Sequence, residues 1–270
     1  MSHQEAFLAL VRAGLWEDVN DNDLPALQAC DLSGANLNDN LFEALDWGRV
    51  ILLAEEQSMV GHVTAGLEKL PTGIVPLTEK LTLLGECQLV EQRNVAMNSF
   101  IADLMLRLRE AGINAVLVKG QGVAQCYDRP LWRESGDVDL LLNENDYEKA
   151  KALLLPLANS VEPEGVENKH LGMYIDSWML ELHGSLRCGI PSRINKVLDE
   201  IQRDIFGDGN LRSWMNGNSQ IFMPSADNDA VYIFTHFLNH FYKGGVGLRQ
   251  ICDWCRLLWK YRNEIDLAKL

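Results

Sequence analysis

The spacing of apolar residues divides the chain into a helical first part, a mixed middle part and a helical last part. Over 78–110, apolar residues recur every three or four positions, which predicts a long helix that ends before Gly112. Between Gly112 and Pro224, short apolar runs separated by turn residues predict strands that alternate with helices. The pattern therefore predicts an α+β fold with three regions: a helical region over 1–111, an α/β core over 112–223 and a helical region over 224–270.

The core region is expected to begin with a buried strand. Residues 115–118 form an apolar run, and Lys119, Gly120 and Gln121 follow at the point where a turn is needed. A short helix over 120–126 would present its first amides, together with Lys119, to an anion, because the helix dipole favours negative charge there. The alternative is that Lys119 is a solvated residue at the end of a strand.

A second strand-like run carries two carboxylates. Asp137 and Asp139 alternate with Val138, Leu140 and Leu142, so both aspartates are expected on one face of the strand. Two like charges about 7 Å apart beside apolar residues repel each other and lose hydration, which favours a cation between them. Mg²⁺ is the natural candidate, since it prefers oxygen ligands and leaves positions open for phosphates. The alternative is an edge strand with both aspartates in solvent.

A third carboxylate is found in another strand-like run. Residues 178–183 alternate so that Glu181 and His183 share one face, and 170–176 are expected to pair with this run as a hairpin. If the 178–183 strand lies beside the Asp137 strand, Glu181 joins the aspartate pair. Three carboxylates can then hold two divalent ions about 3.5 to 4 Å apart, the arrangement that serves phosphoryl displacement.

Two arginines and two histidines are further candidates. Arg133 precedes Asp137 by four residues, and Arg249 follows a glycine-rich segment in the expected first turn of a helix. Arg249 could bind phosphate with its fork of donors or could pair with an acidic residue. His236 and His240 lie one helical turn apart, which allows a metal pair, although no third ligand accompanies them in the sequence.

Composition limits the partners that we expect. The formal net charge is −14, so non-specific attraction to a nucleic-acid backbone is disfavoured. Six cysteines without a secretory signal predict reduced thiols and a cytoplasmic location, and no apolar run reaches membrane-spanning length. Residues 264–270 have the pattern of a beginning helix, which leads us to expect that the chain is a truncated form.

Several separated motifs resemble, in this order, the uncharacterised nucleotidyltransferase family of bacteria, part of the DNA polymerase beta-like nucleotidyltransferase superfamily. They span about 117–259 and are Lys119-Gly120, Arg133, Gly136-Asp137-Val138-Asp139, Glu181-Leu182-His183, His236, 244–249 and Asp253-Trp254. The superfamily usually has Gly-Ser shortly before Asp-x-Asp. This chain has Gly120-Gln121 and a longer gap, so the hydroxyl that binds phosphate in better-known relatives is missing.

The resemblance implies a small mixed β-sheet core and a metal-dependent nucleotidyltransferase that uses two Mg²⁺ ions. Such an enzyme moves a nucleoside monophosphate from a nucleoside triphosphate to an acceptor hydroxyl of a small molecule or another non-template acceptor. Asp137, Asp139 and Glu181 would be catalytic and hold the ions, and the triphosphate would contact Lys119, Gly120, Gln121, Arg133 and Arg249. Two alternatives remain: an inactive nucleotide-binding or partner-binding module with the same fold, and phosphotransfer to a protein.

Overall fold

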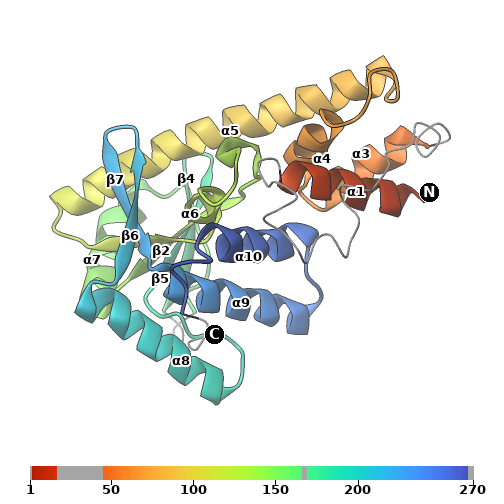
Figure 1. Cartoon of the computed structure of the whole chain (residues 1–270). Coiled ribbons are helices and arrows are strands. Elements are labelled where there is room, and N and C mark those ends of the chain that lie inside the picture. Colours follow the sequence, from red (N-terminus) through yellow and green to blue (C-terminus); the bar gives the residue numbers. More distant parts are fainter. Residues whose placement is uncertain (1, 17–44, 166–168, 267–270) are drawn as a thin grey trace. The chain divides into compact units, whose positions relative to one another are not determined.

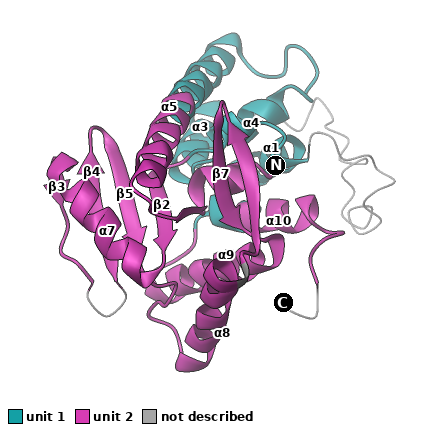
Figure 2. Cartoon of the chain, turned by 90° about the vertical axis from the view of Figure 1, so that its left-hand side faces the viewer, with its two compact units in different colours: residues 1–94, 127–134, 247–252 teal, residues 95–126, 135–246, 253–270 magenta. Residues whose placement is uncertain are grey.

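The computed structural model describes residues 2–16, 45–165 and 169–266 (Figure 1). The chain separates into two compact units, each built from three stretches of sequence (Figure 2). Unit 1 contains residues 1–94, 127–134 and 247–252, and unit 2 contains residues 95–126, 135–246 and 253–270. Neither unit is one continuous segment. The expected helix over 264–270 falls mostly outside the described residues.

The described part of unit 1 is helical. Its elements are α1 (His3–Leu15), α3 (Trp47–Glu56), α4 (Val60–Leu67), the first part of α5 (Leu77–Glu110), the short η2 (Pro130–Trp132) and the start of α10 (Leu248–Lys260). Helices α1 and α4 approach closely through glycines. A Cβ at Gly14 would lie 1.9 Å from the carbonyl oxygen of His62, and one at Gly66 would lie 2.1 Å from that of Leu10.

Unit 2 is built on a five-stranded mixed sheet with the strand order β1-β2-β5-β4-β3. The strands are β1 (Ala115–Val118), β2 (Asp137–Leu142), β3 (Ser160–Val161), β4 (His170–Ile175) and β5 (Trp178–His183). Only β2 and β5 pair in parallel, and the other neighbours are antiparallel. The predicted strands at 115–118 and 178–183 and the predicted hairpin before the latter are therefore present.

Helices and a hairpin complete unit 2. They are the second part of α5, α6 (Gly120–Ala124), α7 (Glu144–Leu154), η3 (Leu155–Leu157), α8 (Ser192–Arg203), the π-helical η4 (Asp204–Asp208), the hairpin β6 (Leu211–Asn216) and β7 (Ser219–Pro224), α9 (Ala226–Lys243) and most of α10. The combination of a small mixed sheet with helices before and after it in the sequence confirms the predicted α+β class.

The two faces of the sheet have different cores. Leu117, Leu140 and Leu182 pack into one apolar cluster with residues of α5 and α7. On the opposite face, Val118 and Leu141 pack into a second cluster, which residues of α8 and α9 complete. Since alternate residues of a strand face opposite sides, the aspartates and Glu181 project on the α8 and α9 side.

The cysteines and the helices were the two features on which composition led to an expectation. Among the described residues, none of the five cysteines forms a disulfide bond. In the same residue ranges, every helix is too short or too polar to cross a bilayer.

Candidate functional site

The three predicted carboxylates come together where β2 and β5 run side by side. In the parallel pairing, Asp139 lies opposite Glu181, and Asp137 lies opposite Met179. Asp137 and Asp139 are two residues apart and therefore share the face on which Glu181 projects. One carboxylate oxygen from each of the three residues lies within 4.8 Å of the other two. A compact set of oxygens is the ligand type that Mg²⁺ prefers.

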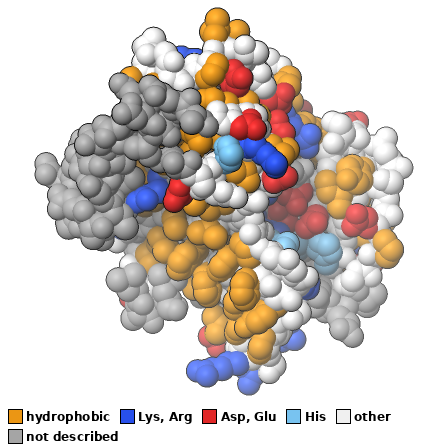
Figure 3. Space-filling view, turned by 90° about the vertical axis from the view of Figure 1, so that its right-hand side faces the viewer, with side chains coloured by type: hydrophobic (Ala, Val, Ile, Leu, Met, Phe, Trp, Pro, Cys, Tyr) orange, Lys and Arg blue, Asp and Glu red, His pale blue; other side chains and the backbone are white. Residues whose placement is uncertain are grey.

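Burial within the trio is graded. Asp139 is only 1% exposed, whereas the side chain of Glu181 is 21% exposed and Asp137 is half-buried. Figure 3 shows acidic side chains gathered on one face of the molecule with histidines beside them. The trio thus combines one buried carboxylate with two that solvent or a ligand can reach.

Lys119 contacts the buried member of the trio. Its Nζ lies 2.6 Å from Oδ1 of Asp139, and both side chains are largely buried. The chain turns sharply here, because Lys119 and Gly120 have φ values of 57° and 37° between β1 and α6. Burial alone would raise the pKa of Asp139, but the charge of Lys119 and a hydrogen bond from His183 outweigh it, so the net shift is downward. Asp139 is therefore ionised at neutral pH.

Two histidines surround Glu181. Nε2 of His170 lies 3.2 Å from Oε2 of Glu181, and Nε2 of His183 lies 3.4 Å from the same oxygen. His183 also lies 2.7 Å from Oδ1 of Asp139. Hydrogen bonds from His170 and then His183 lower the pKa of Glu181. Burial alone would lower the pKa of His183, but its two carboxylate partners produce a net upward shift.

Sequence reasoning placed His183 beside Glu181 but did not include His170. Strand alternation was the signal for His183, since it is two residues from Glu181. The signal for His170 was the expected hairpin, in which antiparallel pairing sets His170 opposite His183. The two rings lie 4.8 Å apart between centroids. A prediction of register, in addition to the strands, was needed to find this contact.

Helix α9 carries titratable side chains whose pKa values are shifted by the loss of hydration and by the charges of Lys119 and Asp139. His236 is half-buried, and its pKa is lowered to about 3, first by the loss of hydration and then by the charge of Lys119. Its Nε2 lies 2.9 Å from Nε2 of His240, so the predicted histidine pair is in contact. Among the described residues, this pair is not part of a group of three potential metal ligands. Burial also raises the pKa of Tyr232, one turn before His236.

The other predicted ligands lie in two different environments. Gln121 is buried in unit 2, with Nε2 3.7 Å from the sulfur of Met97. Arg133 and Arg249 belong to unit 1, where both guanidinium groups donate to the carbonyl oxygen of Glu134. The structure therefore brings Lys119 to the carboxylates and gives each of the two arginines a partner within unit 1.

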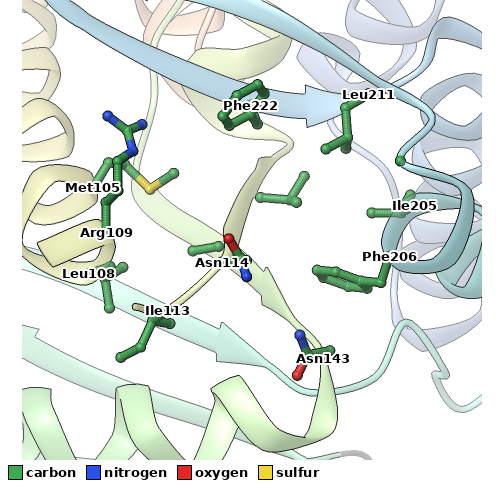
Figure 4. A pocket seen from close by; sticks show the side chains of 13 residues that line it. Met105, Leu108, Arg109, Ile113, Asn114, Asn143, Ile205, Phe206, Leu211 and Phe222 are labelled. Atoms are coloured by element: carbon green, nitrogen blue, oxygen red, sulfur yellow. The ribbon is translucent and has the colours of Figure 1, made fainter. Parts of the chain in front are cut away.

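A separate cavity of about 260 Å³ opens at the other end of β1 (Figure 4). Its walls are mostly apolar, with Arg109, Asn114 and Asn143 as polar groups, and η4 contributes Ile205 and Phe206. The antiparallel register pairs Ala115 with Leu142 near this cavity and Val118 with Asp139 near the carboxylates. The cavity and the carboxylate trio thus lie toward opposite ends of β1.

The mixed sheet sets an Asp-x-Asp strand beside a glutamate-bearing strand, the arrangement that the family resemblance implied. The sequence matches, over residues 43–270, a family described as uncharacterised nucleotidyltransferase, and the chain belongs to that family. Membership makes nucleotidyl transfer the activity class to test first.

The chain also has a distant structural likeness to a solved protein. A crystal structure of an antigenic nucleotidyltransferase-like protein from Paracoccidioides brasiliensis is similar at 12% identity, over 60% of this chain and 74% of that chain, with a TM-score of 0.38. A likeness this distant carries no argument about activity. No curated protein matches the sequence.

Proposed function

We propose that this protein is a metal-dependent nucleotidyltransferase that moves a nucleoside monophosphate from a nucleoside triphosphate to an acceptor hydroxyl. The observation that carries the proposal is the convergence of Asp137, Asp139 and Glu181 in a chain of this family. Pyrophosphate would leave as the acceptor oxygen bonds to the alpha phosphorus, and the hydroxyl proton would pass to Glu181 or to solvent. The acceptor is expected to be a small molecule or another non-template hydroxyl, because the formal net charge of −14 opposes binding of a nucleic-acid template.

The carboxylates fit divalent magnesium in number and type. The trio offers oxygen ligands within 4.8 Å of one another, and Lys119 balances only part of their negative charge. Asp137 and Asp139 would hold two Mg²⁺ ions, and Glu181 would complete the second ion's ligand set. Bound there, the ions would supply charge neutralisation at the attacking and leaving oxygens.

Lys119 is the group best suited to contact the triphosphate. Its ammonium group carries a full charge on a flexible stem and sits against Asp139, at one edge of the trio. If the ammonium group moved from Asp139 to the triphosphate, Asp139 would be released to bind a metal ion, so triphosphate binding would favour metal binding. Contacts from Gly120, Gln121, Arg133 and Arg249 remain part of the proposal, which for these four residues rests on the family resemblance.

Incubation with alpha-labelled triphosphates, Mg²⁺ and a panel of candidate acceptors tests this proposal. Asp137→Asn and Asp139→Asn remove one negative charge each with little change in shape. Asp176→Asn is a matched control, because Asp176 is an exposed residue in the turn between β4 and β5, at a left-handed position that asparagine tolerates. We expect transfer by the wild type and the control but not by the other two. Transfer that survives both substitutions would refute the assigned roles.

A second candidate is a module that binds nucleotide without turnover. Two observations favour it: Lys119 already engages the buried carboxylate, and Gln121 stands where relatives have a phosphate-binding hydroxyl. Calorimetric titration with triphosphate and Mg²⁺ separates the candidates. Tight binding with no transfer to any acceptor supports the module, and a cytoplasmic nucleotide pool would be its source of ligand.

A further inference from the structure

The environment of Glu181 contains a second possible ligand set that differs chemically from the three carboxylates. His170, Glu181 and His183 each offer one ligand atom, and these atoms lie within 4.8 Å of one another. Both imidazole Nε2 atoms approach the same Oε2 of Glu181, at 3.2 Å and 3.4 Å. Glu181 therefore belongs to two potential ligand sets: the three carboxylates, which offer oxygen atoms alone, and the set with His170 and His183, which offers two nitrogen atoms.

The two nitrogen-to-oxygen distances match the distance between neighbouring ligand atoms in a tetrahedral metal site. Ligands bound tetrahedrally at about 2.0 to 2.1 Å from Zn²⁺ are about 3.3 Å apart. The two nitrogen-to-oxygen distances differ from this value by about 0.1 Å, so each histidine nitrogen already lies at a suitable distance from Glu181 for a shared ion. The histidines come from paired positions of β4 and β5, which holds their rings in fixed relation.

The donor types decide which ion such a group selects. Imidazole nitrogen suits Zn²⁺ and neighbouring first-row ions, whereas Mg²⁺ prefers oxygen alone. The side chains of His170, Glu181 and His183 are 36%, 21% and 11% exposed, so one side of the group faces solvent. Three protein ligands with an open side form the arrangement in which a metal keeps a position for water or substrate.

We propose that His170, Glu181 and His183 form a site for a divalent transition-metal ion of the Zn²⁺ or Co²⁺ type, distinct from the magnesium site and linked to it through Glu181. An ion at this site replaces the proton through which His183 contacts Asp139. The protein would then carry a mixed pair, with a nitrogen-ligated ion beside an oxygen-ligated one. The inference concerns the same cluster as the proposed nucleotidyl transfer, but it does not require turnover.

Co²⁺ is the probe for the test, because its visible spectrum and its hyperfine-shifted imidazole N–H signals report histidine ligation directly. Purified full-length protein is titrated with Co²⁺ in the presence of excess Mg²⁺. We expect a saturable visible band, two shifted imidazole N–H signals and displacement by Zn²⁺. His170→Gln should weaken Co²⁺ binding by about tenfold or more. Asp137→Asn, which alters the three-carboxylate set but none of the three ligands proposed for Co²⁺, should leave the visible Co²⁺ band unchanged.

His170→Gln is the variant compared with wild type, because the His170 side chain is partly exposed and the variant is expected to fold. Circular dichroism checks its folding. His3→Gln is the control, since His3 lies in unit 1, where its Nε2 accepts a hydrogen bond from the backbone amide of Asp46, the N-cap of α3. Absence of shifted imidazole signals in the wild type, or equal Co²⁺ affinity in His170→Gln and wild type, would overturn the inference and leave two histidines that merely hydrogen-bond Glu181. Absence of nucleotidyl transfer with these signals present would count against the proposed function alone.

Discussion

Lys119 and Asp139 form a buried ion pair, with Nζ 2.6 Å from Oδ1. The residues are brought together by the antiparallel pairing of β1 and β2, which sets Val118 opposite Asp139. Their side chains are 13% and 2% exposed, so neither charge is well hydrated. Removing one partner of a buried pair costs more than the pair contributes, since the other charge is left without compensation.

Lys119→Met is therefore expected to destabilise the protein by about 3 kcal/mol in the absence of divalent ions. Mg²⁺ should restore part of the loss, because ions that bind only the folded state stabilise it. Urea unfolding with and without Mg²⁺ measures both effects. Lys149→Met is the control, as its pair with Asp146 is exposed on the lysine side, and its effect should stay within about 0.5 kcal/mol. Equal stability of Lys119→Met and wild type would contradict the expected role of the pair.

Asp146 should make stability depend on acid pH. It accepts hydrogen bonds from the Asn114 amide, the Asn143 side chain and Lys149. Burial alone would raise the pKa of Asp146, but these hydrogen bonds give a net downward shift. Because the folded pKa lies below the unfolded one, the stabilisation is complete above about pH 4 and is lost as the pH falls through the folded value.

We expect Asp146→Asn to cost about 1 to 2 kcal/mol at pH 7, and we expect the difference from wild type to shrink by pH 3. Unfolding curves at both pH values provide the measurement. Asp176→Asn should show no such difference at either pH. A gap between Asp146→Asn and wild type that is unchanged at pH 3 would speak against an ionised, hydrogen-bonded Asp146.

His236 should remain neutral throughout the physiological range. Its pKa is lowered to about 3 by burial and by the charge of Lys119. Below the usual histidine pKa of about 6.5, the unfolded chain binds a proton here and the folded chain does not, so stability decreases as the pH falls toward 3. Imidazole NMR should show no titration of His236 between pH 5 and 8, and His183 should titrate at higher pH than His236. Protonation of His236 near pH 6 would contradict the lowered pKa expected from partial burial and the charge of Lys119.

Two glycine substitutions in unit 1 should have opposite effects. A Cβ at Gly14 would meet the backbone of α4 at 1.9 Å, so Gly14→Ala should cost at least about 1 to 3 kcal/mol. Gly85 lies within α5, and among the described residues no atom beyond the neighbouring turns of its own helix lies within 4 Å of its added Cβ. Gly85→Ala should stabilise the helix by about 0.5 to 1 kcal/mol. Thermal unfolding of both variants provides the comparison, and a loss of similar size in both would exclude the close approach of α1 and α4 as the cause.

The sequence alone predicted the elements that have strong local patterns. The helix expected over 78–110 is α5, and the strands expected at 115–118 and 178–183 are β1 and β5. Alternation also predicted which residues share a face, so Asp139 and Glu181 could be expected to meet once their strands were neighbours. Period and turn chemistry are local properties, and a single chain displays them directly.

Only the tertiary structure decided which charges meet. The pairing of Lys119 with Asp139 and of His170 with Glu181 depends on strand register, and the presence of His236 near Lys119 depends on how α9 covers the sheet. Arg133 and Arg249 were predicted, with Lys119, to contact the triphosphate. Both arginines belong to unit 1, because the chain passes between the two units more than once. Alternation tells which side a residue faces, but the neighbours on that side are set by contacts between segments far apart in the chain, whose energies no local pattern contains.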